Sequence, residues 1–339
     1  MKKNFLFSMI FISVLSVFVS CSNKNMINGW YTDYDSALKA AKSGNRSILL
    51  LLTSDTDLDF TAKAIDALVR KDDTFSKSVK KDFVCLFFDF TNIKDKLSVL
   101  DENATNKAQK AYEKDRKILD RKFFIADHFL CGNDTPCARL ISSDGYYITD
   151  VNFDYATENV GAYVKILETY QDEIKFRSDL IAATKKGSSL ERVVAYDALY
   201  ESLPESNRIG ETQIHDAILS LDKKNESGLV EKYLAESINA EAYAKIMKLD
   251  IDGAVAVYEK RIEDERLSPD VKQELLCYAA AISMHSNTVQ FDKVIDLYQK
   301  AFDVAPESEL ASDIKNTILA VELAKEDYST QQATASESK

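Results

Sequence analysis

Two short, continuous apolar runs constrain what the first half of this chain can fold into. They occupy residues 48–52 and 83–88, and a helical pattern at 60–69 lies between them. An apolar run of this length is typical of a strand that is buried on both faces of a sheet. Two such strands with a helix between them predict a parallel pair joined by a right-handed crossover.

A hairpin is predicted farther along the chain. Short apolar runs at 138–141 and 146–151 flank a turn that contains Asp144 and Gly145. An Asp-Gly pair between two such runs is a strong signal for antiparallel strands. The first half should therefore contain a mixed sheet.

Helices are predicted on both sides of the hairpin, at 104–129 and 158–176. The apolar positions of the first helix are Tyr112, Ile118, Phe123 and Phe124. Residues 177–326 then read as helix throughout. A disordered tail is expected at 327–339, since residues 329–339 lack a large apolar side chain.

Two segments of the helical half resemble each other. Residues 252–260 and 291–302 align at an offset of 40 residues, which is within the range of helical-hairpin repeats. The second segment weakly resembles the latter half of a tetratricopeptide repeat, through Tyr298, Ala301 and Pro306. An ordinary helical domain is an equally weighted alternative.

Composition narrows the class of protein. Glycine and proline number only 9 and 4 in 339 residues, which disfavours an all-β fold with many tight turns. An apolar content of 45% supports a sizeable core, and the length leaves room for two domains. The net charge of −12 argues against a nucleic-acid partner, because phosphate backbones would repel the chain.

The N-terminus has the parts of an export signal. Lys2 and Lys3 precede an apolar stretch at 5–19, and the small residue Ser20 precedes Cys21. The apolar stretch is shorter than the roughly 20 residues that span a bilayer as a helix. The small residue before a cysteine, with a polar stretch after it, resembles the lipobox of bacterial lipoproteins.

This resemblance implies a place in the cell envelope. A signal peptide at 1–20 would be removed, Cys21 would carry the lipid, and residues 21–27 would link the anchor to the first domain. Placement in the outer membrane is favoured over the inner one, because Ser22 and not an acidic residue follows the cysteine. An uncleaved anchor or a plain secretory signal is the alternative.

An ordered series of features in residues 28–176 points to a second family. The features are Trp30, the helix at 37–42, the strand at 48–52 with Thr53, Ser54 and Asp55 after it, the strand that ends at Asp89, the Thr135-Pro136 pair and the Asp144-Gly145 turn. In this order they resemble the thioredoxin-like domains of exported bacterial proteins. The resemblance implies an α/β domain with a central mixed sheet flanked by helices. It also implies a cis proline at Pro136 that faces the redox site.

The chain departs from that family at the redox site itself. Asp57 and Phe60 stand where the two cysteines of the C-x-x-C motif should fall. Dithiol exchange needs a thiolate that attacks a disulfide, and neither a carboxylate nor a phenyl ring can replace it. Asp57 can instead cap the helix that follows. We therefore predict a redox-inactive domain.

The other cysteines have several interpretations. Cys85 and Cys277 lie in buried strand and helix patterns and are expected to be inert core residues. Cys131 and Cys137 flank the loop that contains Pro136. In an oxidising compartment a structural disulfide is the favoured interpretation. Two reduced thiols, or a relocated redox pair, are the alternatives.

No spacing predicts a metal, a cofactor or a catalytic residue. His128, His215 and His285 are far apart in the chain, and no glycine-rich loop suggests a phosphate site. The acid pairs Asp57/Asp59 and Asp72/Asp73 are more typical of solvated helix ends than of calcium or hydrolytic sites.

Three functional hypotheses follow. The favoured one is a lipid-anchored envelope protein that acts as a binding or scaffold module for an envelope protein or peptide, since folds often persist as platforms after their chemistry is lost. The alternative is an atypical thiol-disulfide oxidoreductase that uses Cys131 and Cys137. In the third, the all-helical domain alone acts as an envelope-assembly adaptor.

Overall fold

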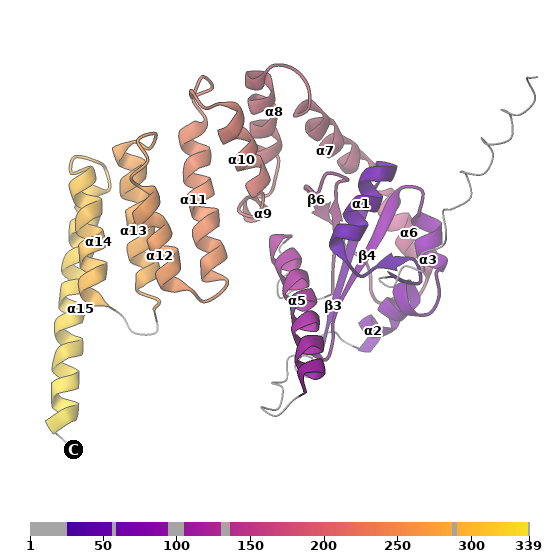
Figure 1. The fold of residues 1–339 in the computed structure, drawn as a ribbon, viewed down its shortest axis with the longest axis horizontal. Coiled ribbons are helices and arrows are strands. Elements are labelled where there is room, and N and C mark those ends of the chain that lie inside the picture. Colours follow the sequence, from indigo (N-terminus) through magenta and orange to yellow (C-terminus); the bar gives the residue numbers. More distant parts are fainter. Residues whose placement is uncertain (1–25, 56–58, 94–104, 130–135, 287–289, 338–339) are drawn as a thin grey trace, which may run out of the picture. The chain divides into compact units, whose positions relative to one another are not determined.

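The computed structural model describes residues 26–55, 59–93, 105–129, 136–286 and 290–337 (Figure 1). These residues divide into two compact units. The N-terminal unit comprises the described residues up to Asp127 and those from 136 to 174. The helical unit comprises the described residues from Lys175 onward, together with His128 and Phe129.

Within the described residues, the N-terminal unit is built around a six-stranded mixed sheet. Its strands are β1 (Met26–Ile27), β2 (Trp30–Tyr31), β3 (Ser47–Ser54), β4 (Phe83–Phe90), β5 (Cys137–Ile141) and β6 (Tyr147–Asp150). They lie in the order β1-β2-β4-β3-β5-β6. β3 is parallel to β4 and antiparallel to β5, and β5 is antiparallel to β6. The predicted parallel pair and hairpin are confirmed.

Helices flank this sheet. They are α1 (Tyr34–Gly44), α2 (Asp59–Ile65), the π-helical turn η1 (Asp66–Arg70), α3 (Thr74–Val79), α5 (Asn106–His128) and α6 (Val160–Glu168). Local side chains fix their ends. The carboxylate of Asp33 caps α1 by accepting the backbone N–H of Ser36 at 2.8 Å. Asn45 ends α1 in the left-handed conformation, at φ 47°.

Trp30 lies at the centre of the core of the N-terminal unit and is fully buried. Its ring stacks on Phe75 with centroids 5.5 Å apart and meets the edge of Phe87 at 6.3 Å. Its indole N–H donates to the backbone carbonyl of Leu68 at 2.9 Å. Trp30 therefore ties β2 to β4, η1 and α3.

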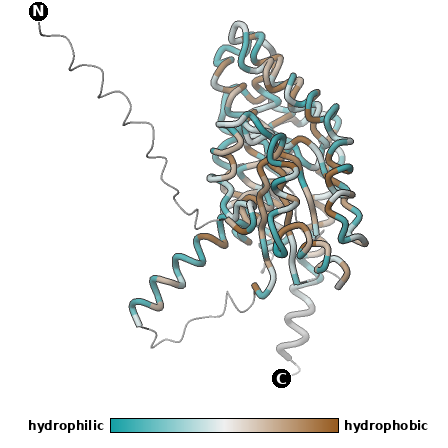
Figure 2. Tube along the Cα trace, turned by 90° about the vertical axis from the view of Figure 1, so that its right-hand side faces the viewer, coloured by the Kyte–Doolittle hydropathy of each residue, from teal (hydrophilic) through white to brown (hydrophobic). Residues whose placement is uncertain are grey.

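The helix α5 packs through its C-terminal half. Phe123 stacks on Phe90 with centroids 4.8 Å apart, and Arg121 forms an ion pair with Asp35 at 2.8 Å. Residues 106–117 contain no buried side chain. Figure 2 shows this half of the helix projecting from the rest of the N-terminal unit.

The apolar positions expected for this helix do not form its buried face. Ile118, Phe123 and Phe124 are exposed by 49%, 38% and 56%, and the buried positions include Leu119 and Ile125. Only the C-terminal half of α5 packs on the unit, and the N-terminal half is exposed. The positions of apolar residues in the sequence therefore did not identify the side of the helix that is buried.

The helical unit follows as a succession of helices. They are α7 (Gln171–Ala183), α8 (Ser189–Glu201), α9 (Glu205–Arg208), α10 (Thr212–Leu221), α11 (Val230–Ile246), α12 (Ile251–Arg261), α13 (Pro269–Ser283), α14 (Phe291–Val304) and α15 (Ala311–Glu337). From α10 to α15, each helix packs on the next one in the sequence. The single helix expected at 158–176 is divided, because the chain turns at Thr169 and Tyr170 between α6 and α7.

The two similar segments of the sequence form α12 and α14, and both pack against α13. Asp250 caps α12 by accepting the N–H of Gly253 at 3.0 Å. Ser268 caps α13, with Pro269 at its first position. The likeness to a tetratricopeptide repeat stays a prediction.

The last helix extends beyond the expected end of the helical domain. α15 continues to Glu337, into residues for which the sequence predicted a disordered tail. Its residues include no glycine or proline and many good helix formers, so the backbone can continue beyond the last packed turn.

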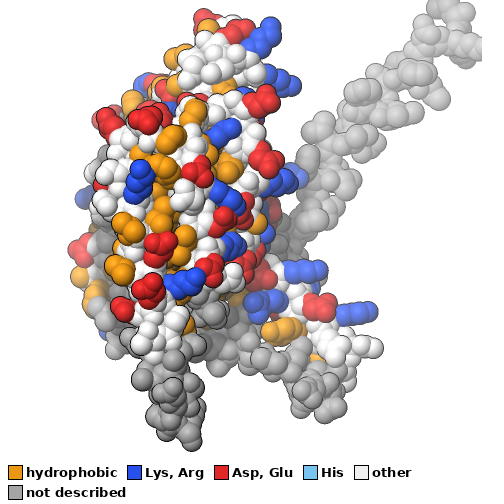
Figure 3. Space-filling view, turned by 90° about the vertical axis from the view of Figure 1, so that its left-hand side faces the viewer, with side chains coloured by type: hydrophobic (Ala, Val, Ile, Leu, Met, Phe, Trp, Pro, Cys, Tyr) orange, Lys and Arg blue, Asp and Glu red, His pale blue; other side chains and the backbone are white. Residues whose placement is uncertain are grey.

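Figure 3, which faces the end of the helical unit, shows apolar side chains lying between charged ones. Among the described residues, no helix combines the length and the apolar character that a transmembrane span requires.

Candidate functional site

The carboxyl ends of β3 and β4 meet at one edge of the sheet, because the two strands are parallel. Asp55 follows β3 and accepts the backbone N–H of Asn92 with both carboxylate oxygens, at 2.8 and 2.9 Å. Asp89, near the end of β4, accepts the N–H and the hydroxyl of Thr91 at 2.9 and 2.6 Å. These bonds fix the turns that follow both strands.

Arg70 adds two ion pairs at the same edge. Its guanidinium lies 3.1 Å from Asp89 and 2.9 Å from Asp66, and 5.8 Å from the centroid of the Phe87 ring. Burial alone would raise the pKa of Asp89, but hydrogen bonds from Thr91 and Arg70 outweigh it and hold the pKa below its ordinary value. Asp89 is thus an ionised structural group, and its low pKa suits it poorly to general-base catalysis.

Three of the predicted site residues lie next to β3 or β5. Phe60 is the second residue of α2, which follows β3, and half of its side chain is exposed. Pro136 directly precedes β5. Cys137 begins β5 opposite Leu52 and is 5% exposed.

The remaining predicted site residues cannot be placed in this way. Cys21, Asp57, Cys131 and Thr135 lie outside the described residues. Lipidation, the helix cap and the disulfide between Cys131 and Cys137 therefore stay predictions, as does the cis bond at Pro136.

Two other cysteines belong to a strand interior and to the helical unit. Cys85 is in the middle of β4 and 3% exposed, and its burial raises the pKa of the thiol. Cys277 is partly buried on α13, where burial and the charge of Glu274 raise its pKa. Both groups are thiols at neutral pH, which disfavours disulfide exchange.

The acidic residues that the structure describes do not gather into a metal site. Among the described residues, no group of three or more His, Cys, Asp or Glu side chains is placed to hold a metal ion. Of the acid pairs, Asp72 accepts the N–H of Thr74 at 2.8 Å and Asp73 pairs with Lys77 at 2.8 Å. Both interactions stabilise the start of α3, as expected for acids at a helix end.

The helical unit contains a pocket of about 670 Å³ between the start of α13 and the turn from α14 to α15. Its lining residues are Asp270, Val271, Gln273, Glu274, Ala305, Pro306, Glu307, Ser308, Glu309 and Leu310. Four of these carry carboxylates, and none of them is Lys, Arg or His. We call this site the acidic pocket. Its charge favours a cationic group, such as a Lys or Arg side chain of a peptide.

Gln273 holds the two sides of the acidic pocket together. Its side chain is fully buried, and its amide N–H group donates to the carbonyls of Ala301 and Ala305 at 3.0 and 2.9 Å. Its amide oxygen accepts the hydroxyl of Ser308. These bonds connect α13 to the end of α14 and to the turn after it, so the two sides of the pocket are held at fixed positions relative to each other.

The acidic pocket was not predicted from the sequence. The available signal was a proline break at Pro306 with Glu307 and Glu309 immediately after it. Nothing in the sequence indicated that this turn would face Asp270 and Glu274, which lie more than thirty residues earlier.

A second feature of the helical unit is a buried histidine. His215 of α10 is fully buried between Tyr200 and Tyr233, with ring centroids at 5.2 and 5.8 Å. Neither ring nitrogen hydrogen-bonds to a described residue, and burial lowers the pKa of His215 to about 4. Nearby, Lys232 pairs with Asp197 at 2.9 Å, and its ammonium lies 4.8 Å from the centroid of Tyr233.

Comparison with known proteins identifies a family that matches part of the chain. Residues 229–327 match the model of a family described as an uncharacterised protein C-terminal domain. No curated protein and no solved structure matches the chain. The matched segment is less than a third of the chain and runs from the start of α11 into α15. All the residues that line the acidic pocket lie inside the segment shared with that family.

Proposed function

We propose that this is a lipid-anchored protein of the cell envelope that binds a partner and has no redox activity. Its N-terminal unit would be a thioredoxin-like domain. A parallel β3/β4 pair joined through α2, η1 and α3, followed by the antiparallel β5/β6 hairpin and α6, supports this assignment. Cys21 would carry the anchor.

The observation that carries the proposal is the side chain at Phe60. It lies at the start of α2, where a thioredoxin-like domain presents a redox cysteine, and half of it is exposed. A phenyl ring cannot attack a disulfide. At the carboxyl ends of β3 and β4, Asp55 holds a turn and Asp89 holds a turn and an ion pair.

One observation favours the alternative, an atypical thiol-disulfide oxidoreductase. Cys137 begins β5 opposite Leu52 and so lies near the end of β3 that precedes α2. A reducible bond between Cys131 and Cys137 would place redox chemistry there. The side chain of Cys137 is only 5% exposed, which disfavours attack by an external thiolate.

An insulin-reduction assay separates the two functions. We expect the chain from Ser22 onward to show no turnover above the uncatalysed rate, and free-thiol counting by mass spectrometry to find a Cys131–Cys137 bond that glutathione does not reduce. Cys277→Ser is the control for general effects of removing a thiol. Turnover that is lost in Cys137→Ser and kept in Cys277→Ser would overturn the non-enzymatic proposal.

The helical unit is the proposed partner-binding part. The acidic pocket offers four carboxylates on a frame fixed by Gln273, and it lies in the segment shared with another protein family. A basic segment of an envelope protein fits this chemistry, because a Lys or Arg side chain can enter and pair with the lining carboxylates.

Reversing the charge of the acidic pocket tests this assignment. Glu274→Lys with Glu307→Lys should weaken binding of a synthetic lysine-rich peptide by at least about tenfold, since two attractions become repulsions. The measurement is isothermal titration calorimetry with the chain from Ser22 onward. The control, Glu263→Lys with Glu265→Lys, makes the same change of net charge at exposed positions between α12 and α13. An equal loss in both variants would contradict binding at the pocket.

A further inference from the structure

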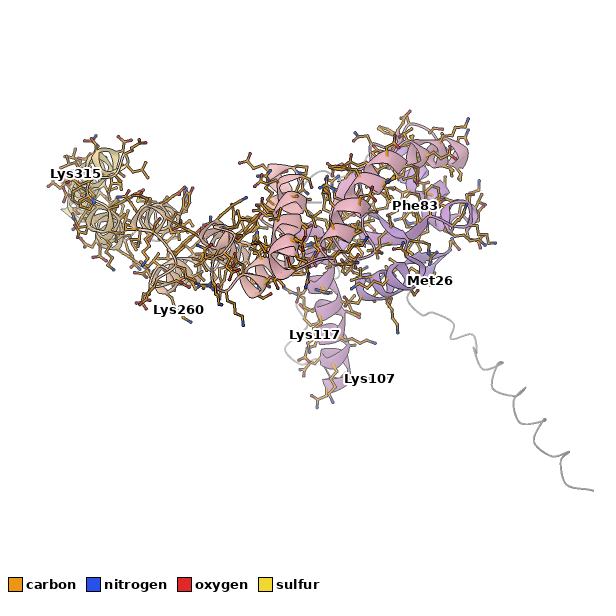
Figure 4. All side chains as sticks on the ribbon, turned by 90° about the horizontal axis from the view of Figure 1, so that it is seen from above. Met26, Phe83, Lys107, Lys117, Lys260 and Lys315 are labelled. Carbon is orange, nitrogen blue, oxygen red and sulfur yellow. The ribbon has the colours of Figure 1, made fainter. Side chains whose placement is uncertain are left out.

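The exposed half of α5 carries a stripe of lysines. Lys107, Lys110, Lys114 and Lys117 are all exposed. At 100° per residue they fall within an arc of about 80° on one side of the helix, over a length of about 15 Å. We call these four residues the lysine stripe. Figure 4 shows its two ends, Lys107 and Lys117, on the projecting helix.

The stripe is free of negative charge along its own helix. The acidic residues of α5 are Glu113, Asp115, Asp120 and Asp127. At the same helical spacing all four lie outside the arc of the lysine stripe. The stripe ends at Lys117, ahead of the packed part of the helix, since the buried residues Leu119, Ile125 and Ala126 all come after it.

Apolar side chains border the stripe near its base. Ile118 and Phe124 are exposed by 49% and 56%, and each lies about 20° beyond one edge of the arc. Lysines beside exposed apolar side chains are typical of helices that rest on a membrane surface, where the ammonium groups meet headgroups and the apolar groups enter the interface.

The length of the tether places this helix within reach of a bilayer. Four residues separate Cys21 from Met26, where the described chain begins, and the five steps from one Cα to the other span at most about 17 Å. Met26 and α5 belong to the same unit. In Figure 4 they lie on the same side of that unit, toward which the lysine-bearing half of α5 projects.

We propose that α5 docks the N-terminal unit onto anionic phospholipid headgroups through the lysine stripe. This inference rests on the proposed lipid anchor, which brings the unit to a membrane. Charge complementarity favours this orientation of the protein on an anionic membrane. The protein as a whole carries a net charge of −12 and would be repelled, whereas the stripe presents four cations without an intervening acid. The contact orients the unit, while the anchor supplies most of the attachment.

Vesicle co-sedimentation tests the docking without the anchor. The chain from Ser22 to Lys339 contains every described element, and it should bind vesicles of phosphatidylcholine with phosphatidylglycerol but not vesicles of phosphatidylcholine alone. Replacing the four lysines of the stripe by glutamine should lower the vesicle affinity at least tenfold, since each surface cation contributes about fivefold. Raising the salt to about 0.5 M should abolish binding.

The matched control replaces four exposed lysines of the helical unit by glutamine, Lys186, Lys223, Lys224 and Lys248. This control should bind anionic vesicles like the unmodified chain. Equal loss in the two variants, equal binding to neutral vesicles, or no binding to anionic vesicles would overturn the proposal. Self-association lost only in the stripe variant, measured by sedimentation without vesicles, would instead assign the stripe to a second copy of the chain.

The anchor is tested separately by the intact mass of the full chain expressed in a bacterium. A diacylated Cys21 with no α5-dependent vesicle binding would remove the docking and leave the proposed function standing. An unmodified Cys21 with α5-dependent binding would remove the anchor and leave the lysine stripe as a membrane-binding surface.

Discussion

Replacing Trp30 by alanine is expected to lower the free energy of unfolding of the N-terminal unit by about 3–5 kcal/mol. The side chain is fully buried, so its removal takes a large apolar surface from the core and leaves a cavity. The stacking on Phe75 and the edge contact with Phe87 are lost as well. The carbonyl of Leu68 also loses its donor, the indole N–H at 2.9 Å.

Urea unfolding followed by circular dichroism measures this change. Trp30 is the only tryptophan of the chain, so its fluorescence identifies the transition of the N-terminal unit in the unmodified protein. Trp30→Phe keeps an aromatic ring against Phe75 and loses the hydrogen bond, and it should cost about 1–2 kcal/mol. A loss in Trp30→Ala no greater than in Trp30→Phe would show that the ring does not support this core.

The central strands of the N-terminal unit could be predicted because the pattern that identifies each of them lies in consecutive residues. Residues 48–52 and 83–88 are apolar without interruption, and a short segment with this pattern favours a strand covered on both faces. The two-residue strands β1 and β2 have no comparable pattern and depend on pairing with each other and with β4. The sequence alone could not identify them.

The candidate sites were harder to predict because they depend on contacts between distant segments. The acidic pocket forms only where the start of α13 meets the turn after α14, a contact fixed by Gln273. The lysine stripe has a regular spacing in the sequence, but its exposure depends on which half of α5 packs. By contrast, the loss of the C-x-x-C motif is visible in the residues alone, at Asp57 and Phe60.

The buried His215 predicts a specific dependence of stability on pH. Its pKa is lowered to about 4 in the folded helical unit, against 6.5 in an unfolded chain. The unfolded state therefore binds a proton that the folded state excludes at pH values between these two. The contribution of the neutral His215 to the free energy of unfolding is fully present above pH 6.5. Below this value the free energy of unfolding falls by about 1.4 kcal/mol per pH unit, and the total loss reaches roughly 3 kcal/mol near pH 4.

His215→Phe should remove most of this loss, because a phenyl ring fits between Tyr200 and Tyr233 and cannot take up a proton. Urea unfolding of the helical unit at pH values from 7 to 4.5 provides the comparison. His285→Phe, at an exposed position after α13, is the matched control and should keep the loss.

Carboxylates do not account for a difference between the two proteins in this window. Those of the helical unit with lowered pKa values, such as Asp264 at about 2 and Asp222, contribute stability that is lost mainly below about pH 5, and they are the same in the unmodified chain and in His215→Phe. The ion pair of Lys232 with Asp197, beside Tyr233, is common to both proteins and does not distinguish them. A loss between pH 6.5 and 4.5 that is present in the unmodified chain and absent in His215→Phe therefore belongs to the histidine. If the free energies of unfolding of these two proteins fell equally with pH, the explanation would be wrong. His215 would then accept its proton inside the core, and the space between the two tyrosines would be more polar than its residues indicate.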